Sequence, residues 1–130
     1  IYHKFSTEDE HWPTTSENFR DILLLCVIHE FGFYVTHKLC HSYPCLYQYH
    51  KVHHEYKHNS TLASQHNHPI DFLFSIAGPA LLALLLVHQA HSISQFQYIV
   101  WTLYSNFDDH VGYHFPWSPI RWFPFSASTD

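Results

Sequence analysis

The feature that most constrains the fold is an uncharged apolar run at residues 72–87, FLFSIAGPALLALLLV. Extended back to Ile70 it reaches 18 residues. With a rise of about 1.5 Å per residue, a helix of this length is near the lower limit for crossing the hydrocarbon core of a bilayer. Pro79 follows Gly78 and is expected to kink such a helix. The run therefore predicts a membrane helix.

Two further segments have apolar character. Residues 19–39 fit one long helix, which is interrupted by His29 and Glu30 and is either a membrane span or a buried helix of a soluble bundle. Residues 98–107 are shorter and predict a tilted or re-entrant return segment. Between them, residues 47–58 form a helix that is polar nearly all round and should lie outside the hydrocarbon. We therefore expect an all-α fold, an integral-membrane helical bundle with a cytosolic, histidine-rich helical cap.

Histidine is unusually frequent, at 15 of 130 residues, and two groups have the spacing of helix turns. The first group is His37 and His41, and the second is His50, His53 and His54. On an α-helix, positions three and four apart lie on one face, so each group predicts a stripe of imidazoles. Neutral imidazole is the commonest metal ligand among side chains. Two adjacent helices carrying these stripes would surround a pair of metal ions.

A third group, His110 and His114, lies in the segment DDHVGYH. If residues 70–107 enter the membrane and come back, this group returns to the side that holds the first two. Positive charge favours the cytosolic side of a membrane, and the basic residues agree with that orientation: Lys38, Lys51, Lys57 and Arg121. We expect the three groups to converge on a cytosolic surface.

Composition excludes several other classes of function. With 6 basic residues against 11 acidic ones, the chain has no electrostatic footprint for nucleic acid. The three cysteines lack the paired C-x-x-C spacing of a structural zinc site. No flavin or nicotinamide fingerprint is present, so any reducing equivalents must come from outside the chain.

Four motifs resemble the fatty acid hydroxylase and sterol desaturase superfamily of integral-membrane di-iron oxygenases. They are HKLCH at 37–41, HKVHHEY at 50–56, HPID at 68–71 and DDHVGYHFPW at 108–117, in the family's order. The resemblance implies a non-haem di-iron centre with no catalytic residue beyond its ligands, which are His37, His41, His50, His53, His54, His110 and His114. His68 is a further possible ligand or supporting residue. Carboxylates are expected to accept ring N–H groups of the ligands, with Asp109 favoured over Asp108, Glu55 and Asp71.

The resemblance also implies a reaction, which is hydroxylation of a lipid C–H bond with O₂. A sterol is the favoured substrate, and fatty acyl or sphingolipid hydroxylation is the alternative. Electrons would come from NAD(P)H through a reductase and a small haem protein, at the endoplasmic reticulum membrane with the histidine boxes facing the cytosol. Outside the family, a non-catalytic histidine-rich metal-binding membrane protein, or one with pH-sensing or structural histidines, stays open.

The ends of the chain bear on completeness. The sequence begins at Ile1 and stops at Asp130, shortly after WFPF at 122–125, where the family's last H-x-x-H-H box should begin. We therefore expect residues 1–130 to be a single partial domain, truncated at both ends. Lacking some of its ligands, this piece alone should be inactive.

Overall fold

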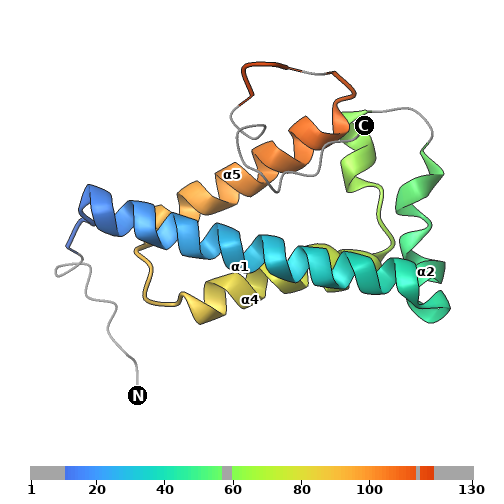
Figure 1. Cartoon of the computed structure of the whole chain (residues 1–130), viewed down its shortest axis with the longest axis horizontal. Helices are drawn as coiled ribbons and strands as arrows, with labels where there is room; N and C mark the ends of the chain where they lie inside the picture. Colours follow the sequence, from blue (N-terminus) through green and yellow to red (C-terminus); the bar gives the residue numbers. More distant parts are fainter. Residues whose placement is uncertain (1–10, 57–59, 114, 119–130) are drawn as a thin grey trace.

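The computed structural model describes residues 11–56, 60–113 and 115–118, and the regular elements in this part of the chain are all helices (Figure 1). The longest is α1, Thr15–Ser42, with 28 residues. It begins at a capping box, in which Thr14 Oγ1 accepts from the Glu17 backbone and Glu17 Oε2 accepts from the Thr14 backbone. It ends at Ser42, and the next residue, Tyr43, is extended because Pro44 follows it. The predicted all-α class is confirmed.

The polar segment after α1 does not form the single helix expected over 47–58. Helix α2, Pro44–His50, ends at the first histidine of the second group. After Lys51 and Val52 the chain continues as a short 3₁₀-helix, η1, over His53–Glu55. A polar segment of this kind has no apolar face to stabilise a long helix by packing, so tertiary contacts decide its path.

The uncharged run forms a continuous helical stretch from Pro69 to Leu86 in three parts. These are α3 (Pro69–Asp71), the π-helix η3 (Phe72–Ala77) and α4 (Gly78–Leu86). Pro79 has no N–H, and its ring would clash with the carbonyl of Ser75 in an α-helix. The wider π turn, with the Gly78 N–H bonded to the Leu73 carbonyl, accommodates it. The irregularity expected at Pro79 takes this form.

Close packing joins this stretch to α1, with α5 (Ser92–His110) on the other side of α1 in Figure 1. A Cβ on Gly32 would lie 3.2 Å from the Pro79 Cβ, so glycine permits the close approach. The buried apolar side chains between the helices include Leu25, Ala83 and Tyr98.

Among the described residues, α1 and the stretch from Pro69 to Leu86 are the two helices long and apolar enough to cross a membrane. Their outer faces carry large exposed apolar side chains, such as Phe31 at 69% and Leu85 at 71% exposure. Apolar surface of this extent is typical of a membrane or partner-facing surface. The return segment expected at 98–107 lies within α5, which is not among the candidate spans.

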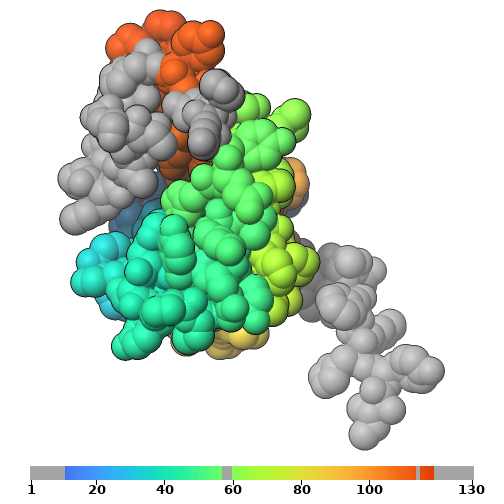
Figure 2. All heavy atoms as spheres, turned by 90° about the vertical axis from the view of Figure 1, so that its right-hand side faces the viewer, coloured from blue at the N-terminus to red at the C-terminus, as the bar shows by residue number. Residues whose placement is uncertain are grey.

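The polar elements gather at the carboxyl end of α1. Helix α2 packs on α1 and α3, and the 3₁₀-helix η2, Thr61–Gln65, packs on α5. Figure 2 views the molecule from this end, where the segment joining α1 to α3 covers the surface. The first two histidine groups and His110 of the third lie here.

Candidate metal centre

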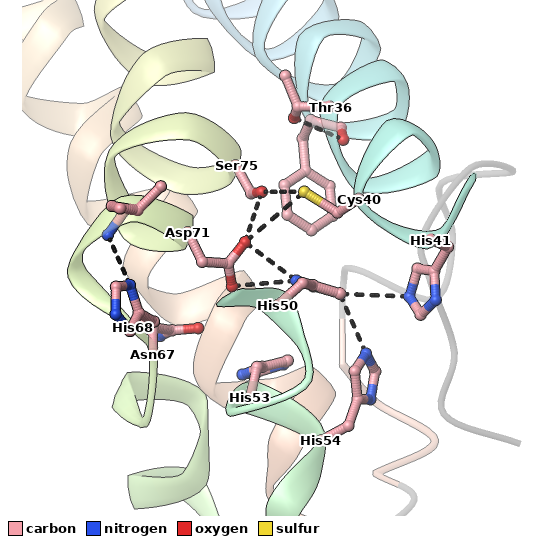
Figure 3. Close-up of polar contacts among 12 residues, drawn as sticks. Thr36, Cys40, His41, His50, His53, His54, Asn67, His68, Asp71 and Ser75 are labelled. Atoms are coloured by element: carbon pink, nitrogen blue, oxygen red, sulfur yellow. Dashed lines mark hydrogen bonds and ion pairs between the residues drawn. The ribbon is translucent and has the colours of Figure 1, made fainter. Parts of the chain in front are cut away.

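Four imidazoles from three elements meet at the carboxyl end of α1. His37 and His41 lie on α1, His50 ends α2 and His54 lies on η1, and their ligating atoms are all within 4.8 Å of one another. His50 Nε2 is 3.2 Å from His41 Nε2 and 3.0 Å from His54 Nε2 (Figure 3). Two nitrogens that each lie about 2.1 Å from one ion are roughly 3.0 to 3.4 Å apart at right-angle to tetrahedral geometry. These nitrogens therefore have the spacing of ligands to a single ion.

The orientation of His50 is set by a buried carboxylate. Its Nδ1 lies 3.0 Å from each carboxylate oxygen of Asp71, and both side chains are 2% exposed. A carboxylate accepts, so the imidazole proton resides on Nδ1. Nε2 is then unprotonated, and its lone pair faces His41 and His54. This is the tautomer that a metal ligand needs.

Two more buried side chains surround that carboxylate. Ser75 Oγ donates to Asp71 Oδ1 at 2.8 Å. The Cys40 thiol lies 3.3 Å from Ser75 Oγ and 3.8 Å from Asp71 Oδ1. Cys40 and Ser75 are both 2% exposed, so the whole arrangement is shielded from solvent.

A second pair of imidazoles lies beside the first group. His53 Nε2 on η1 is 3.4 Å from His110 Nε2 at the end of α5. His110 donates its Nδ1–H to the backbone carbonyl of Asn106 at 2.8 Å, so its Nε2 is also the free nitrogen. The rings of His53 and His54 are 5.4 Å apart, which makes the two groups adjacent.

The structure thus brings together six of the seven predicted ligands: His37, His41, His50, His53, His54 and His110. His114 lies outside the described residues. His53 does not share a stripe with His50 and His54 as expected, because the chain leaves the α-helix after His50 and a 3₁₀ turn places His53 toward α5. The two stripes become a group of four and a pair.

His68 is not brought into either group. Its Nδ1 accepts the Ile70 N–H at 3.2 Å, which caps α3, and its ring packs on Tyr49 at 4.8 Å between centroids. Its predicted contribution to the metal site stays a prediction.

Of the carboxylates expected to fix a ligand tautomer, Asp71 contacts a predicted ligand, His50. Asp108 accepts from Ser118 Oγ at 2.9 Å, and Glu55 lies 3.6 Å from His66. Asp109, which was favoured, is half-buried beside His110 at the end of α5, and its role stays a prediction. Sequence reasoning did not single out Ser75, although its place four residues after Asp71 was the available signal.

The electrostatics favour neutral imidazoles at η1. Desolvation, reinforced by His110 and the neighbouring imidazoles, lowers the pKa of His53 to about 4. Desolvation together with His50 and His41 also lowers the pKa of His54. Both rings are therefore neutral near pH 7, with a lone pair available for a metal ion.

Comparisons with known proteins bear on the identity of this site. The family model described as fatty acid hydroxylase matches residues 22–129. The chain is 34% identical to methylsterol monooxygenase 2-2 of Arabidopsis thaliana over 122 residues, 91% of this chain and 44% of the relative. It is also 34% identical to the very-long-chain aldehyde decarbonylase GL1-8 of Oryza sativa subsp. indica, over 92% of this chain and 43% of the relative.

A fungal relative gives a similar match. The C-4 methylsterol oxidase erg25 of Schizosaccharomyces pombe is 29% identical over 92% of this chain and 41% of its own length. No solved structure matches the chain. The chain spans less than half the length of these relatives.

Proposed function

The chain belongs to the fatty acid hydroxylase family, as its histidine motifs predicted, and from this we propose that it is part of a membrane-bound, non-haem di-iron monooxygenase that hydroxylates a lipid, preferably a sterol. The observation that carries the proposal is the convergence of six imidazoles at one end of two apolar helices. Because the chain spans less than half of its relatives, the activity is proposed for the complete protein.

The residues present fit iron. Neutral imidazole nitrogen is a suitable ligand for Fe²⁺, and two of the histidines, His50 and His110, have the free Nε2 that coordination needs. The first ion would be held by His37, His41, His50 and His54. His53 and His110 would contribute to the second, with His114 as a further proposed ligand. When bound, the iron pair would pass two electrons from the external donor to O₂, so that one oxygen atom is inserted into an unactivated C–H bond and the other leaves as water.

The remainder of the chain would bring the lipid to that end. The exposed apolar faces of α1 and α4 suit insertion into a bilayer, so a lipid substrate can approach without leaving the hydrocarbon. In this orientation the polar elements α2, η1 and η2 lie at the membrane surface. We place that surface on the cytosolic side of the endoplasmic reticulum, where a reductase and a small haem protein would deliver electrons from NAD(P)H.

The preference for a sterol rests on relatives from a plant and a yeast that are both named for methylsterol oxidation. The second candidate is a very-long-chain aldehyde, because a decarbonylase is equally identical to this chain. Fatty acyl hydroxylation is the family-level alternative.

The test uses microsomes that contain the complete protein, from a host whose own methylsterol oxidation has been deleted. They are given NADPH, ¹⁸O₂ and either a 4-methylsterol or a very-long-chain aldehyde, with anaerobic microsomes and a His50→Ala variant as controls. We expect ¹⁸O in an oxidised sterol and about two irons per chain in the purified protein. Aldehyde loss with unchanged sterol would support the second candidate. Absence of turnover and of bound iron would overturn the proposal in favour of a non-catalytic protein.

A further inference from the structure

We propose that Asp71 is the positioning residue of the four-imidazole group, and that Ser75 and Cys40 hold its carboxylate in place. This proposal rests on the proposed function, since it takes His50 to be a metal ligand. The Asp71 network consists of Asp71, Ser75 and Cys40. Cys40 and Asp71 also lie with His50 in a group whose possible ligand atoms are within 4.8 Å of one another. The Asp71 carboxylate, however, contacts the Nδ1 of His50, whereas the Nε2 of His50 faces His41 and His54, so we assign the network to act on the four-imidazole group through His50 (Figure 3).

The hydrogen bonds of the network run in one direction. Asp71 can only accept, so both His50 Nδ1–H and Ser75 Oγ–H donate to it. Since the serine proton is used in that bond, the Cys40 thiol is the donor in its own two contacts, to Asp71 Oδ1 at 3.8 Å and to Ser75 Oγ at 3.3 Å. The donated protons of the network therefore all point toward the carboxylate. This direction places the His50 proton on Nδ1 and leaves Nε2 unprotonated.

The network also joins three elements. Cys40 lies on α1, three positions after His37 and therefore on the same side of the helix. Asp71 and Ser75 lie one turn apart on the stretch from Pro69 to Leu86. His50 comes from α2. Ser75 lies within the π-helix η3, which sets its position relative to Asp71. Single π-helical turns are frequent at functional sites.

Burial makes the arrangement specific. Among the residues that the structure describes, His50 is the ion-pair partner recorded for the Asp71 carboxylate, and both side chains are nearly inaccessible. A buried carboxylate facing an imidazole raises the electron density on the other ring nitrogen and fixes the ring plane. An acidic residue whose only role was to stabilise the start of α3 would be expected to lie exposed at the N-terminus of that helix. The Asp71 carboxylate is instead buried against His50, which lies 21 positions away in the sequence.

The experiment measures metal binding by the complete protein, independently of turnover. Metal-free protein is titrated with Co²⁺ in the presence of a competing chelator, and the visible absorption bands of bound Co²⁺ are recorded. Asp71→Asn keeps an oxygen that can accept from His50 but removes the charge, while Asp71→Ala removes both. The matched control is Asp21→Asn, which makes the same change at a carboxylate 5% exposed near the other end of α1.

We expect Asp71→Ala to weaken Co²⁺ binding by about 10- to 100-fold and to shift the absorption bands, with Asp71→Asn between it and the wild type. Asp71→Glu should recover part of the affinity. Ser75→Ala should weaken binding less than Asp71→Ala, and its matched control is Ser94→Ala, a fully buried serine bonded to Asn18 instead.

Two results would overturn the proposal. The first is Co²⁺ affinity and bands in Asp71→Ala equal to those of Asp21→Asn. If the Asp71 variants fail to fold, the second applies, which is Ser75→Ala binding Co²⁺ as tightly as Ser94→Ala does. Wild-type protein that binds neither Co²⁺ nor iron would instead overturn the proposed function, so the two failures are distinguishable.

Discussion

The four-imidazole group and the His53–His110 pair are built alike but supported differently. In each, one histidine donates its Nδ1–H to an oxygen and presents its Nε2 to the other imidazoles. For His50 that oxygen belongs to the carboxylate of Asp71, which comes from another element. For His110 it is the carbonyl of Asn106, one turn earlier on the same helix. The first support depends on tertiary packing, whereas the second is local and neutral.

The difference has a consequence for affinity. Four converging imidazoles, one of them bonded to a carboxylate, should bind a cation more tightly than two imidazoles, one of them bonded to a backbone carbonyl. The pair also needs ligands beyond those described. We therefore expect the four-imidazole group to fill first when iron is limiting, and the pair to fill second.

The largest effect is expected from His50→Ala. This substitution removes the central nitrogen of the four-imidazole group and leaves the Asp71 carboxylate buried without its imidazole. We expect loss of both irons from the complete protein, and a fall in turnover greater than the roughly 100-fold cost of losing a supporting residue. Iron analysis and lipid turnover check this, with the exposed His11→Ala as the control. Retention of two irons would show that His50 is not a ligand.

A smaller loss of iron is expected from His110→Ala. The group of four would remain complete, so about one iron per chain should stay bound while turnover is lost because the second ion is missing. Quantitative iron analysis of the purified variant beside His50→Ala measures the difference. If His110→Ala lost both irons and His50→Ala kept one, the order of affinity drawn from the comparison would be reversed.

Acid should destabilise the metal-free protein through η1. An unfolded histidine takes up a proton near pH 6.5, but the pKa of folded His53 is about 4 and that of His54 is also lowered. Between those pH values the unfolded state binds more protons, so the free energy of unfolding decreases as the pH falls from 6.5 toward 4. Thermal midpoints measured at pH 7, 6 and 5 should decline less in His53→Gln than in the wild type or in His11→Gln. If the thermal midpoint fell equally with pH in all three proteins, the lowered pKa of His53 would be contradicted.

The comparison also indicates what the sequence could predict. The pairing of His37 with His41 follows from helical periodicity, which is local, and the order of the four motifs led to the family. The facing of His53 and His110 could not be predicted, because it depends on a 3₁₀ turn after His50 and on the packing of η2 against α5. In the same way, adjacency to His110 favoured Asp109, whereas the contact between Asp71 and His50 arises from the packing of α3 on α2.

The smallest effect is expected from His68→Ala, which defines the edge of the four-imidazole group. His68 precedes Asp71 by three positions, yet its Nδ1 accepts the Ile70 N–H and its ring contacts Tyr49 rather than a predicted ligand. Losing this cap should cost about 1 kcal/mol of the free energy of unfolding, as for other N-cap side chains. Iron content and the Co²⁺ bands should not change. Chemical denaturation measures the first quantity and metal titration the second. A loss of iron as large as that of His50→Ala would move His68 from the helix cap into the metal site.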